Sequence, residues 1–333
     1  MNFTAFQKQV AKQMQERLAE SVRVETSQVT KNNGVVWNGI RVFREGVNAA
    51  PMIYLDELYR EYCDGRTMHS IVGQVIRVYE KSRLEGSIQM DFFLDYEQVR
   101  GKIVYRLVNY HRNEELLKTM PHIRFLDLAV IFVCLVMNDS MSGASILINS
   151  KHCSMWQVDA DELFRAASEN TPRYQRICVK SMEEVIQDMF EEKLQVETQR
   201  FLNDKYSDYS REQAGRWADE MRAQLERELA AGRESGAFMY VMGNRSKQYG
   251  AGTILYPEAL AEAAERLGQN LFILPCSVHE VILIPDTGRE TAWQLQQMVR
   301  EVNATQLEAE DILSDSVYYF DRTIGEVTLA CEG

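Results

Sequence analysis

Residues 129–137 read AVIFVCLVM and belong to the longest wholly apolar run in the chain. It is rich in β-branched residues and shows no polar alternation, which is typical of a strand buried on both faces. A helix needs about twenty apolar residues to cross a bilayer, roughly twice the length of this run. We therefore expect a buried strand over residues 130–136, and no membrane span.

Strand-like sequence follows this run at 144–148. Asp159 and Glu162 then predict the start of a helix that continues through Ala167, and Pro172 is expected to end it. The same order returns later in the chain. A strand at 238–242 precedes Gly250-Ala251-Gly252, a second strand at 253–256 and a helix at 257–267. This recurrence favours a degenerate strand-strand-helix repeat.

The N-terminal part begins with an amphipathic helix, because apolar residues recur at spacings of three and four from Phe3 to Leu18. Asn33-Gly34 separates strand-like residues 22–30 from 35–43, which indicates a hairpin, since this pair tolerates the positive φ angles of a tight turn. Further patterns predict helices at 52–62 and 68–83 and a strand at 103–108.

A helical connector is expected between the two parts of the repeat. Ser181-x-x-Glu184 and Ser210-x-x-Gln213 are capping-box patterns that open helices. Trp217, Met221 and Leu225 form a narrow apolar stripe on the second helix, which we expect to pack on a lobe or a partner. Residues 183–234 hold fourteen acids and eight bases, so this connector carries half of the chain's net charge of −12.

The last hundred residues add a strand at 281–284 and a terminal hairpin over 317–320 and 326–329. Thr287-x-x-Glu290 and Thr305-x-x-Glu308 predict the starts of two more helices. Together these patterns predict an α+β fold with a mixed or antiparallel sheet and packed helices. The expected domains are an N-terminal lobe at 1–180, the acidic connector at 181–232 and a C-terminal lobe at 233–333.

Composition narrows the class of protein. Apolar residues make up 45% and charged residues 26%, as in soluble globular proteins. The six cysteines lack CxxC spacing, and Met1 to Leu18 has no apolar signal-peptide core, so we expect a cytoplasmic protein. The acidic charge and the absence of a basic cluster in the sequence predict no direct nucleic-acid binding.

One segment gathers reactive side chains: Cys276, Ser277, His279 and Glu280 lie within five residues. If the segment is extended, Ser277 and His279 share a face and Glu280 points away from them. A hydrolase using Ser277 or Cys276 with His279 would then need a carboxylate from elsewhere, and we expect none within reach. The alternative is structural, with residues 275–277 forming a turn and His279 half buried, so no catalytic residue is assigned.

No pattern indicates a metal or cofactor. The five histidines are dispersed, without an HExxH pair or a Cys/His run. Gly250-Ala251-Gly252 lacks the residues that let a glycine-rich loop hold phosphate at a helix N-terminus. We interpret it as a close approach between backbones.

Several short blocks resemble, in order, a bacterial family known only as a domain of unknown function. These blocks are Lys31-Asn32-Asn33-Gly34, residues 51–55, 239–241, Tyr249-Gly250-Ala251, 273–275, His279-Glu280-Val281 and Leu313-Ser314-Asp315. The resemblance runs nearly end to end, and Cys276 stands where many members carry serine. It implies no activity, cofactor or catalytic residue.

The sequence favours a non-catalytic accessory or regulatory protein that binds a macromolecular partner, an unidentified protein. Two alternatives stay open. One is the hydrolase built on Ser277 or Cys276 with His279, and the other is an acidic decoy that occupies a nucleic-acid-binding protein.

Overall fold

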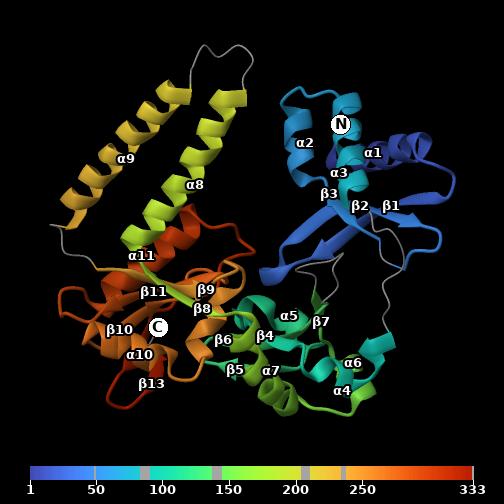
Figure 1. Ribbon diagram of the computed structural model, residues 1–333. Coiled ribbons are helices and arrows are strands. Elements are labelled where there is room, and N and C mark those ends of the chain that lie inside the picture. The colour runs from blue at the N-terminus through green and yellow to red at the C-terminus, as the bar shows by residue number, and fades with distance from the viewer. Residues whose placement is uncertain (49, 83–90, 137–144, 204–210, 234–237, 332–333) are drawn as a thin grey trace. The chain divides into compact units, whose positions relative to one another are not determined.

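The computed structural model describes residues 1–48, 50–82, 91–136, 145–203, 211–233 and 238–331 (Figure 1). These residues form helices and antiparallel sheets, which confirms the predicted α+β class. Contacts divide the chain into two compact units. The first comprises 1–104, 108–123 and 131–167, and the second comprises 105–107, 124–130 and 168–333.

The first unit opens with a three-stranded antiparallel sheet in the order β1-β2-β3. Its strands are β1 (Val22–Thr30), β2 (Val36–Arg44) and β3 (Met52–Tyr54). The accompanying helices are α1 (Phe3–Arg17), α2 (Asp56–Cys63) and α3 (Met68–Ser82). Figure 1 shows the three helices gathered on one side of this sheet. Phe6, Val10 and Met14 of α1 are fully buried in the resulting core, as their spacing predicts.

The β1–β2 hairpin is confirmed together with its turn chemistry. Asn33 and Gly34 both adopt positive φ angles, 58° and 70°. The prediction of a helix from residue 52 is wrong at its start. Residues 52–54 pair with β2 instead, and α2 begins at Asp56, because Ile53 completes the core opposite Ile40.

The rest of the first unit is built from short elements. The helical segments are η2 (Asp91–Leu94), α4 (Tyr96–Arg100), η3 (His111–Asn113), α5 (Glu114–Leu117), α6 (Ser150–Trp156) and α7 (Ala160–Tyr174), whose last turns belong to the second unit. Asp159 caps α7 as predicted, accepting a hydrogen bond from the Glu162 amide at 2.9 Å. Pro172 does not end this helix. It lies in the last turn, where a proline removes only one backbone hydrogen bond.

A second sheet has the order β4-β6-β5, with β7 also paired to β6, and the division between the two units passes through its strands. Its strands are β4 (Ile103–Asn109), β5 (His122–Phe125), β6 (Leu128–Leu135) and β7 (Ser145–Leu147). Residues 128–134 of β6 are buried without interruption, which confirms the strand expected from the apolar run.

The second unit is organised by a six-stranded antiparallel sheet in the order β13-β12-β10-β11-β9-β8. Its strands are β8 (Ile177–Ser181), β9 (Tyr240–Asn244), β10 (Leu271–Leu274), β11 (Glu280–Pro285), β12 (Tyr318–Asp321) and β13 (Glu326–Leu329). The helical segments are α8 (Met182–Asn203), α9 (Arg211–Arg233), η4 (Gly250–Leu255), α10 (Ala259–Leu267) and α11 (Ala292–Thr305). Leu295 and Val299 of α11 pack on Phe272 and Leu274 of β10.

The second strand of the predicted repeat is absent. Gly250 to Leu255 form the 3-10 helix η4, where the repeat requires a strand at 253–256. In the other part of the predicted repeat, Gly143 and Ala144 lie outside the described residues. Gly250 makes the close backbone approach expected of this glycine-rich stretch, because a Cβ on it would stand 2.5 Å from the His279 carbonyl oxygen.

Two predicted helix starts are also wrong. Gly288 has a φ of 74°, so a turn occupies the residues after Thr287, and α11 begins at Ala292 with Thr291 as its N-cap. Thr305 is the last residue of α11, and no helix follows it within the described C-terminal residues 306–331.

Candidate functional site

Three chain segments meet around the predicted reactive residues, all within the second unit. The Val278 amide donates to the Asp311 carbonyl at 2.9 Å, and the Leu313 amide donates to the Cys276 carbonyl at 2.8 Å. The Ala251 amide donates to the Val278 carbonyl at 3.2 Å. Residues 276–279 therefore lie between η4 on one side and the 311–313 segment on the other, and strand β11 begins only at Glu280.

The imidazole of His279 has a partner on each nitrogen. Nδ1 accepts a hydrogen bond from the Tyr249 backbone amide at 3.3 Å. Nε2 lies 3.2 Å from Oδ1 of Asp311. A backbone amide can only donate, so this network assigns the proton to Nε2 and makes Asp311 its acceptor. The expectation that no carboxylate reaches His279 is wrong.

Ser277 is nevertheless not placed as a nucleophile. Its Oγ accepts the His279 backbone amide at 3.0 Å, and its hydroxyl is close enough to the Glu280 carboxyl to influence the pKa of that group. A serine nucleophile gives its proton to the free nitrogen of a histidine, but here that nitrogen already accepts from Tyr249. Sequence alternation had placed Glu280 on the face away from Ser277, whereas the turn brings the two together.

Cys276 and Glu280 are also poorly suited to catalysis, because both side chains are desolvated. Cys276 is buried, and desolvation raises the pKa of its thiol to about 11, so little nucleophilic thiolate forms at neutral pH. Desolvation also raises the pKa of the Glu280 carboxyl above its ordinary value. The cluster is suited to joining three segments, and it lacks an activated nucleophile.

The sequence did not identify Arg106 and Asp311 as members of this cluster. Arg106 of β4 lies over the ring of Tyr249, with 3.8 Å between Cζ and the ring centroid, and burial lowers the pKa of its guanidinium. The Tyr249 ring in turn lies 5.6 Å from the His279 ring. The blocks Tyr249-Gly250-Ala251 and His279-Glu280-Val281 were noted separately, but no local pattern joins them to Arg106 or Asp311.

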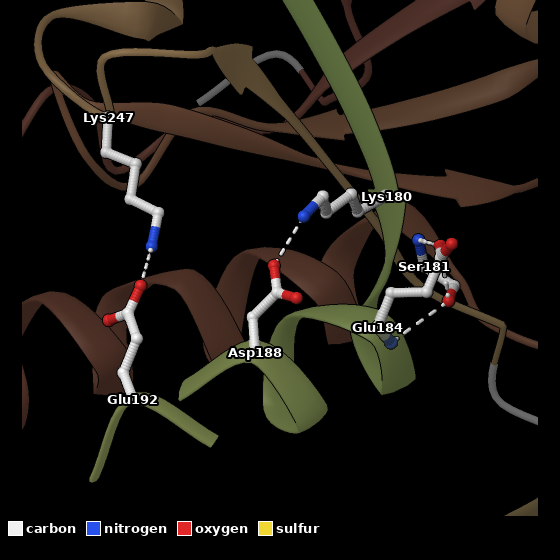
Figure 2. Close-up of polar contacts among 6 residues, drawn as sticks. All are labelled: Lys180, Ser181, Glu184, Asp188, Glu192 and Lys247. Carbon is white, nitrogen blue, oxygen red and sulfur yellow. Dashed lines mark hydrogen bonds and ion pairs between the residues drawn. The ribbon is translucent and has the colours of Figure 1, made fainter. Parts of the chain in front are cut away.

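Helix α8 carries a second candidate site. One face of this helix is anchored to the second unit. Ser181 and Glu184 form the predicted capping box, with the Ser181 amide donating to Glu184 at 2.7 Å and the Glu184 amide donating to Ser181 Oγ at 3.2 Å. Figure 2 shows the next two acids at spacing four reaching lysines of the same unit. Asp188 pairs with Lys180 of β8, and Glu192 pairs with Lys247 at 3.0 Å.

A second face of α8 packs on α9, and Figure 1 shows the two helices side by side. Leu194 and Ala218 are buried, and Arg222 makes two hydrogen bonds to Glu191 at 2.6 and 3.0 Å. Trp217, Met221 and Leu225 are half buried. Helix α9 therefore packs on α8, while the predicted stripe on α9 keeps part of its surface exposed.

The third face of α8 is open. Ile186, Met189 and Val196 are 38%, 62% and 66% exposed. At 100° per residue they fall within an arc of about 80°, and the centre of this arc lies about 100° from the midpoint between Asp188 and Glu192. We call these three residues the α8 stripe. Lys193 and Arg200 are exposed on the same side of the helix.

Within the described ranges, no group of three or more His, Cys, Asp or Glu side chains could hold a metal ion. None of the helices in those ranges combines the length and the apolar character that a bilayer crossing requires.

Fold and site together define an α+β protein whose reactive residues are held in structural hydrogen bonds. Residues 3–322 match the model of a family of unknown function, DUF5688, and the chain belongs to this family. No curated protein and no solved structure matches the chain.

Proposed function

We propose that this chain is a non-catalytic protein that binds a protein partner through the α8 stripe. The observation that carries the proposal is the exposure of Ile186, Met189 and Val196 on a helix whose two other faces are already used. Exposed apolar side chains that share one helix face cost free energy in water, and such faces commonly mark interaction surfaces. A partner that covers them would recover that cost.

The spacing of the stripe favours a helical occupant. Apolar residues at i, i+3 and i+10 on one face are suited to an amphipathic helix laid along α8. Lys193 and Arg200 beside the stripe favour acidic residues on that partner. The negative net charge of residues 183–234 would by itself favour a basic partner, but Asp188, Glu191 and Glu192 already pair with cations of the second unit.

The His279 cluster supports a binding role over hydrolysis. Its imidazole has no nitrogen left to accept the Ser277 proton, and the Cys276 thiol is buried. General-base activation of either nucleophile would require these hydrogen bonds to break first.

Site-specific photocrosslinking in cells tests the proposal. A benzophenone amino acid at Met189 should yield one dominant crosslinked protein, with the crosslink in an amphipathic helix rich in Asp and Glu. The same amino acid at Ile324, which is 68% exposed between β12 and β13, is the matched control for exposure. We expect no enrichment of that protein from the control position.

Equal capture from Met189 and Ile324 would contradict the proposal, since it would mean that exposure alone determines crosslinking. A crosslink only to a second copy of this chain would also contradict it.

A further inference from the structure

Alternation along β1 and β2 sends two sets of side chains to opposite faces of the first sheet. One set, including Ile40 and Val42, lies in the helix-covered core. The other set forms what we call the outer sheet face, and it combines aromatic and basic residues from the three strands and the turn between the first two. Its members are Arg23, Lys31, Trp37, Arg41, Phe43 and Tyr54, with Glu25 and Met52 beside them.

Ring and cation contacts place several of these side chains against one another. The rings of Trp37 and Tyr54 have centroids 5.2 Å apart, and Lys31 Nζ lies 4.9 Å from the Tyr54 centroid. Arg23 lies over Phe43 at 4.9 Å. Arg23, Arg41 and Tyr54 are exposed, while Trp37 and Phe43 are half buried. Rings and cations therefore alternate across a surface that the sequence disperses over more than thirty residues.

We infer that the outer sheet face binds single-stranded nucleic acid. Aromatic side chains on an open sheet stack on unpaired bases, and neighbouring Arg and Lys side chains contact the phosphates. An acidic peptide would use the cations but not the paired rings of Trp37 and Tyr54. A duplex keeps its bases stacked on one another and would not use the rings either.

The net charge of −12 led to the opposite expectation for the whole chain. Charge acts locally, because interactions between exposed charges are screened beyond about 8 Å at physiological salt. The outer sheet face carries three cations and one acid, and the acid, Glu25, pairs with Arg23 at 3.2 Å. The repulsion that the whole-chain charge predicts therefore does not apply at this face.

Fluorescence anisotropy with the full chain and a labelled oligouridine of about 12 nucleotides tests the inference, at about 50 mM salt. We expect saturable binding that weakens about tenfold in Trp37→Ala and in Tyr54→Ala, since each removes one stacking ring. Arg41→Gln should weaken binding and lower its salt dependence. Because Arg41 is exposed, this variant tests the inference even if loss of Trp37 disturbs folding.

Trp293→Ala and Arg322→Gln are the matched controls, because both residues are exposed in the second unit. They should leave the affinity unchanged. Absence of binding, an equal loss of affinity in the controls, or equal affinity for a duplex of the same length would each overturn the inference. Equal affinity for polyglutamate would also overturn it, by showing attraction to any polyanion.

Discussion

The chemistry of His279 depends on what each of its ring nitrogens contacts. In a hydrolytic triad one nitrogen faces the acid and the other faces the nucleophile. Asp311 takes the first role here, but the Tyr249 amide occupies the second position. Local sequence identified His279 and Ser277 as candidates. It could not identify Asp311 or Tyr249, because both reach the imidazole from segments about thirty residues away.

Cysteine labelling tests whether the cluster around His279 has a structural and not a catalytic role. In the native protein at neutral pH, iodoacetamide should modify the exposed Cys63 well before the buried Cys276, whose thiol has a pKa of about 11. Mass spectrometry of each site over time measures the two rates. Labelling of Cys276 as fast as Cys63, abolished by His279→Ala, would contradict a structural role for the cluster.

The pH dependence of stability tests the burial of Glu280. Its carboxyl has a raised pKa in the folded chain, so the folded state keeps the proton over a pH range in which the unfolded state has released it. The free energy of unfolding therefore falls as pH rises through that range. Glu280→Gln removes this loss, so its melting temperature relative to wild type should be higher at pH 7 than at about pH 4.

Glu262→Gln on α10 is the control for that measurement, because Glu262 is exposed and the same charge is removed. If the melting temperature of Glu280→Gln differs from that of wild type by the same amount at both pH values, burial does not raise the pKa of the Glu280 carboxyl.

At the scale of elements, local signals succeeded where the partners are close in sequence. The Ser181 and Glu184 capping box and the Asn33-Gly34 turn formed as predicted, because their hydrogen bonds and φ angles involve only neighbouring residues. Thr287-x-x-Glu290 and Thr291-x-x-Gln294 both have the capping-box pattern. The helix starts at the second pattern, since the positive φ of Gly288 is incompatible with a helix that begins after Thr287. β3 was missed because its strand conformation depends on pairing with β2.

The α8–α9 hairpin offers a direct test of which α8 face is packed. Leu194 is 4% exposed and Val196, two residues on, is 66% exposed. Leu194→Ala should therefore cost about 2–5 kcal/mol of local stability, and Val196→Ala about 0.5 kcal/mol or less. Amide hydrogen exchange along α8 measures both, and similar losses for the two variants would contradict the assignment of the open face.

At the scale of the whole molecule, sequence patterns predicted the fold class, whereas the net charge does not describe the charge of individual surfaces. The acids that make residues 183–234 negative include Asp188, Glu191 and Glu192, which pair within the second unit. The cations of the outer sheet face are dispersed in sequence and meet only through strand pairing. A net charge averages over both effects, so neither surface could be predicted before the tertiary structure placed the side chains.

The central claim is that the α8 stripe binds a protein partner. The most direct test measures the affinity of the partner identified by crosslinking for four purified forms of the full chain. These are wild type, Met189→Glu, Val196→Glu and the control Ile324→Glu, compared by titration calorimetry. We predict that a charge at either stripe position weakens binding at least about tenfold, because it leaves a carboxylate in an apolar contact, while Ile324→Glu binds as wild type does. Equal affinity of all four forms would contradict the claim.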